Sequence, residues 1–159
     1  EDYQYGNSFG VVYDNVKTFS VGGELNIDVN RNFKLAIKGQ YFNYNTDMQA
    51  EAWNLPNIEG YVFLDYQISR QWFMGGSVFF TGDRKDESEL LVTLVPIPVT
   101  MVTLDSFFDA NIHLGFKVTD YLSVYGKVNN IANQDYQRWN NFPVQGIQFL
   151  AGATYQFDF

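Results

Sequence analysis

Alternation of apolar and polar side chains is the feature that most restricts how this chain can fold. In the segment 146–159, every second residue from Ile147 to Phe159 is apolar, and Gln148 and Asp158 lie between them. Successive side chains of a β-strand point to opposite faces, so a period of two indicates a strand with one apolar face. The last segment of the chain is therefore a predicted strand.

The same period recurs upstream in seven further stretches. In the stretch 108–118, for example, Ile112 and Leu114 alternate with Asn111 and His113. Aromatic residues make up 18% of the chain and also favour strands. The sequence thus predicts an all-β, antiparallel fold of about eight strands. These strands lie at 9–13, 20–29, 33–41, 62–68, 72–80, 108–118, 121–129 and 146–159.

The links between the predicted strands alternate in length. Outer-membrane β-barrels combine short periplasmic turns with longer outer loops, which produces this alternation. Most of the strands are also about ten residues long, near the roughly 9–11 residues that cross a bilayer when tilted. We therefore predict a transmembrane β-barrel, or a segment of one. The long links are 45–57, 82–105 and 130–145, and the short ones are 30–32, 69–71 and 119–120, with a short outer link at Asn15–Lys17.

The two faces of the predicted strands differ in charge. One face carries Phe, Leu, Ile, Val, Met and Trp on every strand with almost no interruption. A soluble β-sandwich or a lipocalin-like barrel would bury that face, whereas a membrane barrel would expose it to lipid and turn the charged face toward its lumen. The near-continuous apolar face favours the membrane barrel. The charged residues of the other face are Glu24, Asp28, Lys34, Lys38, Asp65, Asp109, Lys117, Lys127 and Asp158.

Composition excludes several classes of protein. No run approaches the roughly 18 apolar residues of a spanning helix, which excludes a helical membrane protein. A net charge of -8 without clustered Lys or Arg argues against a nucleic-acid partner. With no cysteine, one histidine and no Gly-x-Ser-x-Gly motif, the chain offers no catalytic constellation, so we predict no enzyme, cofactor or catalytic residue.

Two charged groups deserve separate interpretation. His113 lies on the polar face near Asp109, where a catalytic pair could be imagined. Polar residues in a lumen usually serve packing and pairing, and we assign that role to His113. The acidic group in 83–89 lacks the glycine and oxygen spacing of a calcium loop, so we predict a solvated outer loop and no metal site.

A stretch near the C-terminus resembles the end of TonB-dependent outer-membrane receptors. It reads Val-Asn-Asn-Ile-Ala-Asn-Gln-Asp-Tyr at 128–136, then Arg138-Trp139 and Phe-Pro-Val-Gln-Gly at 142–146. In that family an Asn-Asn turn ends a strand, a Tyr and a Trp follow, and Pro-x-x-Gly leads into the last strand. The stretches 52–56 and 81–84 are similar to receptors of Bacteroidetes type.

The resemblance implies a location, a function and a set of partners. Tyr155, Phe157 and Phe159 resemble the end signal that the barrel-assembly machinery reads in the bacterial outer membrane. Receptors of this family take up scarce nutrients (siderophores, vitamins or glycans) with energy from the inner membrane. The resemblance also implies a barrel of 22 strands that encloses a plug. The expected partners are therefore outer-membrane lipid, the barrel-assembly machinery, and a plug domain of the parent chain or a surface lipoprotein.

Three accounts of the whole chain follow. Residues 1–159 are expected to form a single β-barrel domain, as the C-terminal segment of a longer receptor barrel. The second account is a free-standing eight-stranded barrel of OmpA-like size with a structural or adhesive role. The third is a soluble β-barrel that carries a small ligand.

Aromatic and apolar residues in the outer links are the candidate contact residues. Trp53, Tyr136, Arg138 and Trp139 could stack a ligand such as a sugar ring or an aromatic chelator, or could belong to an aromatic belt at the membrane interface. The apolar stretch Leu90–Leu104 either extends a hairpin above the membrane or forms a patch that contacts a lipoprotein or lines the mouth of the barrel.

Overall fold

The described residues form one antiparallel sheet of seven strands and two small hairpins. The strands of the sheet pair in the order in which they follow one another along the chain. This computed structural model describes residues 12–88 and 100–157. Within these residues no helix is long and apolar enough to cross a membrane. The sheet contains β1 (Val16–Asn30), β2 (Phe33–Thr46), β3 (Ile58–Gln67), β4 (Trp72–Thr81), β7 (Phe107–Lys117), β8 (Leu122–Asn129) and β11 (Gln148–Tyr155). The hairpins are β5 (Arg84–Ser88) with β6 (Thr100–Leu104), and β9 (Gln137–Trp139) with β10 (Phe142–Pro143).

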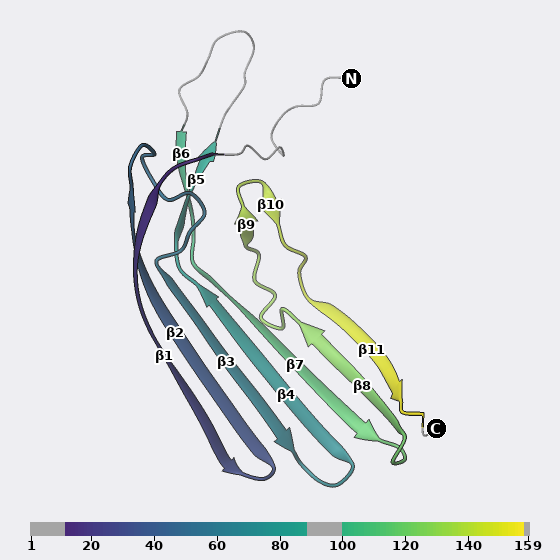
Figure 1. Cartoon of the computed structure of the whole chain (residues 1–159). Helices are drawn as coiled ribbons and strands as arrows, with labels where there is room; N and C mark the ends of the chain where they lie inside the picture. Colours follow the sequence, from purple (N-terminus) through teal and green to yellow (C-terminus); the bar gives the residue numbers. More distant parts are fainter. Residues whose placement is uncertain (1–11, 89–99, 158–159) are drawn as a thin grey trace, which may run out of the picture.

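The sheet has short turns at one end and long links at the other, and both hairpins belong to the long links (Figure 1). The predicted alternation of link lengths is therefore confirmed. Each tight turn uses a polar side chain to accept backbone N–H groups, which stabilises the reversal locally. Asn30 accepts from the N–H of Asn32, Ser69 from those of Gln71 and Trp72, and Thr119 from those of Tyr121 and Leu122.

The N-terminal part of the prediction differs from the structure. Phe9 and Val11 of the predicted first strand lie outside the described residues, and Tyr13, at its end, is not in a strand. Lys17, predicted to be in a short outer link, belongs to β1 instead, because β1 pairs with β2 as far as Val16 opposite Thr46. Backbone pairing to a long partner strand has extended β1 beyond its alternating core.

Register between neighbouring strands gathers apolar residues on one face of the sheet. Residues directly opposite each other on paired strands share a face. One such row crosses five strands and contains only apolar residues. This row is Leu25, Ile37, Val62, Val78 and Ala110. No side chain in the described part is fully buried, so the apolar face is uncovered.

The opposite face carries the predicted charges other than Asp158, which lies outside the described residues, and neighbouring strands place unlike charges opposite each other. Asp28 in β1 faces Lys34 in β2, which in turn faces Asp65 in β3. Glu24 likewise faces Lys38. Pairing of opposite charges across strands favours this register by a few tenths of a kcal/mol to about 1 kcal/mol per pair.

Glycines on the charged face make room for rings from the next strand. The ring of Phe73 in β4 lies over Gly115 in β7, where an added Cβ would be 2.1 Å from the ring. The ring of Tyr125 in β8 lies over Gly152 in β11 in the same way. Since no real Cβ tolerates such a distance, any larger residue at either glycine must displace a ring.

Substitution of Gly115 tests this arrangement. We expect Gly115→Ala to lower the free energy of unfolding by about 1–3 kcal/mol, because the Phe73 ring has to move from its position over residue 115. Gly39→Ala is the control: a Cβ there meets nothing within 4 Å, and alanine in a strand should raise stability by about 0.5–1 kcal/mol. Urea unfolding of both variants in lipid vesicles measures the difference, and effects of the same sign would contradict the role of Phe73.

Candidate functional site

The long links meet at one end of the sheet and contain its buried side chains. Arg84, Asp86, Leu104, Asn130 and Tyr136 are all buried. All five lie between β4 and β7 or between β8 and β11. The sheet itself is open on both faces, so this end is where the chain builds a packed interior.

Arg84 connects the two hairpins at this end. Its guanidinium donates hydrogen bonds to the backbone carbonyls of Gln137 and Arg138, each at 2.7 Å. The same group lies over the ring of Phe107, 5.2 Å from its centroid. Burial lowers the pKa of Arg84, and the carboxylate of Asp86 opposes that shift. Arginine remains charged in such surroundings, so a cation is held here by two carbonyls and a ring, and the Asp86 carboxylate favours it electrostatically.

Tyr136 connects the third long link to Phe107 at the start of β7. Its ring stacks on Phe107 with centroids 3.8 Å apart and planes 8° from parallel. Its hydroxyl donates a hydrogen bond of 2.8 Å to the Asp109 carboxylate. Burial and the hydrogen bond to Asp109 raise the pKa of Tyr136 to about 12. We name Arg84, Asp86, Phe107, Asp109 and Tyr136 the outer-loop cluster.

Two backbone contacts extend the outer-loop cluster to further segments. The carboxylate of Asp86 accepts a hydrogen bond from the N–H of Asn140, in the turn of the β9–β10 hairpin. The N–H of Asn54, in the first long link, donates to the carbonyl of Lys85 at 2.7 Å. All three long links are therefore joined through β5 and held in one arrangement.

The Asn-rich motif after β8 builds a structured turn. Asn130 is only 3% exposed; its side chain accepts from the N–H of Gln134 and donates to the carbonyl of the same residue. Asn133 accepts from the N–H of Ile147, the residue just before β11. Among described residues other than glycine, those with positive φ are all asparagines, which tolerate the left-handed region better than most side chains. They are Asn54, Asn130, Asn133 and Asn141.

The predicted contact residues occupy different environments. Arg138 and Trp139 are exposed on β9, and Trp139 meets Phe142 edge-on. Trp53 is half-buried and donates a hydrogen bond to the side chain of Gln49. Tyr136, by contrast, is buried in the outer-loop cluster with one ring face against Phe107. A role for these residues in ligand contact stays a prediction, and Tyr136 also has a structural role.

Residues of the acidic segment 83–89 and of the apolar stretch Leu90–Leu104 partly stabilise the loops. Asp83 accepts a hydrogen bond from the N–H of Ser106, and Asp86 from that of Asn140. Residues 100–104 form β6, which pairs with β5 and extends a hairpin beyond the sheet. An extended hairpin was one of the two alternatives predicted for the apolar stretch Leu90–Leu104. Residues 89–99 lie outside the described part.

Sequence reasoning missed the central residue of the outer-loop cluster. Arg84 appeared only as the end of the stretch 81–84, and its carbonyl acceptors are 53 and 54 residues away. No periodicity or spacing in a single sequence connects positions that far apart. The aromatic pair Phe107 and Tyr136 was equally invisible as a pair.

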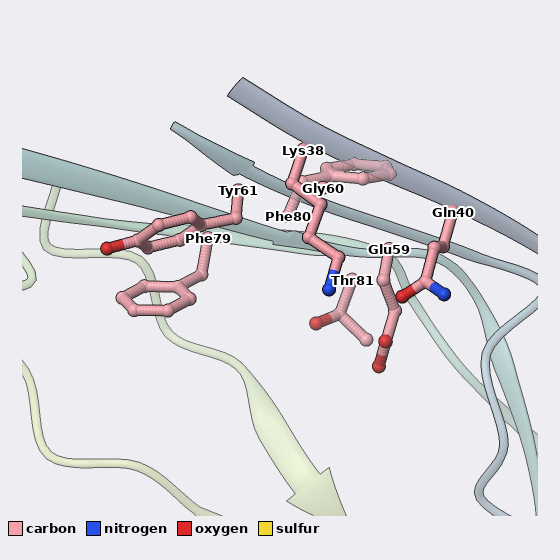
Figure 2. Close-up of a pocket in the computed structure, with 8 residues that line it drawn as sticks. All are labelled: Lys38, Gln40, Glu59, Gly60, Tyr61, Phe79, Phe80 and Thr81. Atoms are coloured by element: carbon pink, nitrogen blue, oxygen red, sulfur yellow. The ribbon is translucent and has the colours of Figure 1, made fainter. Parts of the chain in front are cut away.

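A shallow depression of about 410 Å³ lies on the charged face across β2, β3 and β4. Figure 2 shows Lys38, Tyr61, Glu59, Phe79 and their neighbours on one side of the strands. Register agrees, since Lys38, Tyr61 and Phe79 are successive cross-strand partners, as are Gln40, Glu59 and Thr81. The face expected to carry charges thus also carries exposed rings.

Removal of the Arg84 guanidinium tests the outer-loop cluster. In Arg84→Met the carbonyls of residues 137 and 138 lose their donor. We therefore expect the free energy needed to open the β9–β10 hairpin to fall by about 1–3 kcal/mol. Hydrogen exchange of peptides covering 134–146 measures this. Lys85→Met is the control, because the Lys85 ammonium bonds only an exposed threonine hydroxyl in the described part. Equal exchange in both variants would contradict the assignment.

The pKa of Tyr136 predicts how this end responds to alkali. A raised pKa means that the stabilising contribution is fully present below the ordinary value of 10.0 and is lost as the pH rises through about 12. The difference in tyrosinate absorbance between wild type and Tyr136→Phe should therefore titrate near pH 12. Titration of that difference near pH 10 would show that the hydroxyl is solvated.

No family model and no curated protein sequence matches the chain. Solved structures of TonB-dependent siderophore receptors do. The ferripyoverdine receptor of the Pseudomonas aeruginosa outer membrane, bound to ferripyoverdine, matches 89% of the chain at 12% identity and a TM-score of 0.76. The siderophore receptor PirA of Acinetobacter baumannii matches 86% at 17% identity and 0.70.

The ferric-catecholate import receptor Fiu of E. coli matches 91% of the chain at 14% identity and a TM-score of 0.70. The chain spans only about a fifth of each receptor: 20% of the ferripyoverdine receptor, 21% of PirA and 22% of Fiu. This degree of likeness concerns the fold. The chain has the fold of a stretch of the β-barrel wall of such receptors.

Proposed function

We propose that the chain forms part of the wall of an outer-membrane receptor barrel that takes up a scarce nutrient of the siderophore, vitamin or glycan class. The observation that carries this proposal is the uncovered apolar face. Leu25, Val62, Phe80 and Leu114 come from four different strands and are all exposed there. A face this large has to meet lipid or another apolar surface, and the barrel fold supports lipid.

The sheet edges support a longer barrel. Within the described residues β1 pairs only with β2, and β11 pairs only with β8. Unpaired strand edges are costly in lipid because hydrocarbon offers no hydrogen-bond partner. We propose that further strands of the parent barrel pair with both edges, so that residues 1–159 are its C-terminal segment. A free-standing barrel would instead have to close β1 onto β11.

The two faces and the chain end suggest partners. Outer-membrane lipid would contact the apolar face, and a polar plug domain of the parent chain would meet the charged face. The barrel-assembly machinery would read Tyr155, Phe157 and Phe159. Tyr155 ends β11 and its ring meets Phe157 edge-on at 4.8 Å, whereas Phe159 lies outside the described residues.

The outer-loop cluster suggests how the mouth of the barrel would work. By joining the three long links, it would hold Arg138 and Trp139 on β9 in one position, where they would contact an arriving ligand together with Trp53. A preorganised set of contacts binds more tightly than mobile loops, because less conformational entropy is lost on binding. The Bacteroidetes-type likeness of stretches 52–56 and 81–84, and a lipoprotein contact at 90–104, remain predictions.

Matched arginine substitutions on neighbouring residues of β4 test the membrane assignment. Val78 faces Val62 and Ala110 on the apolar face, whereas Ser77 faces Phe63 and Asn111 on the charged face. We expect Val78→Arg to lower the unfolding free energy in lipid vesicles by about 2–4 kcal/mol. Ser77→Arg should cost less than about 1 kcal/mol, because it projects into the lumen.

Two outcomes would contradict the proposal. One is an equal cost for the two arginines in vesicles. The other is expression of the chain as a monodisperse soluble monomer without detergent, which would support the ligand-carrying soluble barrel. Stable insertion of residues 1–159 alone as a closed monomer would favour the free-standing barrel.

A further inference from the structure

Two aromatic rings stand on the charged face where the strands approach the long links. The rings of Tyr61 and Phe79 lie 4.8 Å apart and 44° from parallel. Figure 2 shows them side by side below the sheet, while the ring of Phe80 points to the other side. Phe79 is 46% exposed. An exposed ring among charged groups is the kind of surface on which an apolar ligand face can stack.

Four polar side chains surround the two rings. Lys38, Gln40, Glu59 and Thr81 line the same depression. Their side chains make no hydrogen bond to another described residue, although Glu59 acts electrostatically on Tyr44. The ammonium is a donor only and the carboxylate an acceptor only, whereas the amide and the hydroxyl are both. The one positive and one negative charge cancel.

We propose that this depression binds a neutral saccharide. The C–H face of a sugar ring would stack on Phe79 and Tyr61, and its hydroxyls, which both donate and accept, would bond to the four polar side chains. A depression of about 410 Å³ falls within the roughly 300–1,000 Å³ of ligand sites. An anionic chelate would gain from Lys38 but would be opposed by Glu59 and by Glu24, which faces Lys38 from β1, so the local charges favour an uncharged ligand over an anionic one.

The position of the depression fits a path through the barrel. Glu59 is the second residue of β3 and Thr81 the last of β4, both at the end with the long links. Phe79 is the cross-strand partner of Asp109, whose carboxylate accepts a hydrogen bond from the Tyr136 hydroxyl. The depression therefore lies directly next to the outer-loop cluster. The proposal rests on the proposed function, because it requires the charged face to line the lumen.

Binding of oligosaccharides to the detergent-solubilised parent barrel, with residues 1–159 in place, tests the proposal. The probes are maltohexaose, cellohexaose and a β-1,3-linked glucan hexasaccharide, each followed by saturation-transfer difference NMR and titration. We expect at least one to bind wild type. Glu59→Ala and Phe79→Leu should each weaken binding by about tenfold, through the loss of one hydrogen bond or of one stacking contact. Asp65→Asn, on the same face of β3 and outside the depression, should leave affinity unchanged.

The outcomes separate this inference from the proposed function. Heat-modifiable migration of each variant checks that the barrel is folded. Failure of all three saccharides to bind a folded barrel overturns the saccharide site and leaves the receptor proposal intact. Unchanged binding in both Glu59→Ala and Phe79→Leu also overturns it, as does a ferric tris-catecholate that binds in place of the saccharides. A parent barrel containing residues 1–159 that does not insert into membranes overturns both.

Discussion

The register between neighbouring strands is the constraint on which the other features of this chain depend. Side chains alternate at every residue, so a slip of one position would exchange the two faces of a strand. The observed pairing puts Leu25 opposite Ile37, and Glu24 opposite Lys38. One set of hydrogen bonds thus produces an apolar face and a charged face at once. The lipid contact and the saccharide site proposed above both need that separation.

The part of the chain that the structure describes buries few apolar side chains, and most of its buried side chains are polar or charged and lie in the long links. A buried cation is costly unless it is fully hydrogen-bonded. At Arg84 two backbone carbonyls, the Phe107 ring and nearby Asp86 offset part of that cost, although its buried Nε has no hydrogen-bond partner among the described residues. Such directional contacts fix the positions of loops more sharply than apolar packing would. The outer-loop cluster is therefore suited to hold residues at the mouth of a barrel in a defined arrangement.

Prediction from the sequence succeeded where local alternation was strong. Period two predicts the seven strands of the main sheet and its charged face. Turn residues such as Ser69 and Thr119 predict the tight turns. Prediction was wrong at Lys17, which pairs within β1, because pairing to a partner strand outweighed weak local pattern. The β9–β10 hairpin was missed because its strands have three and two residues, too short for any period to be visible.

The sequence by itself determined the strand pattern, the division into two faces and the alternation of short and long links. These properties are local, since each depends on residues within a few positions of one another. Only the tertiary structure decided that Arg84 would reach the carbonyls of residues 137 and 138, and that Tyr61 and Phe79 would meet on the charged face. Contacts between distant segments depend on register and loop geometry, which a single sequence does not encode in any periodic form.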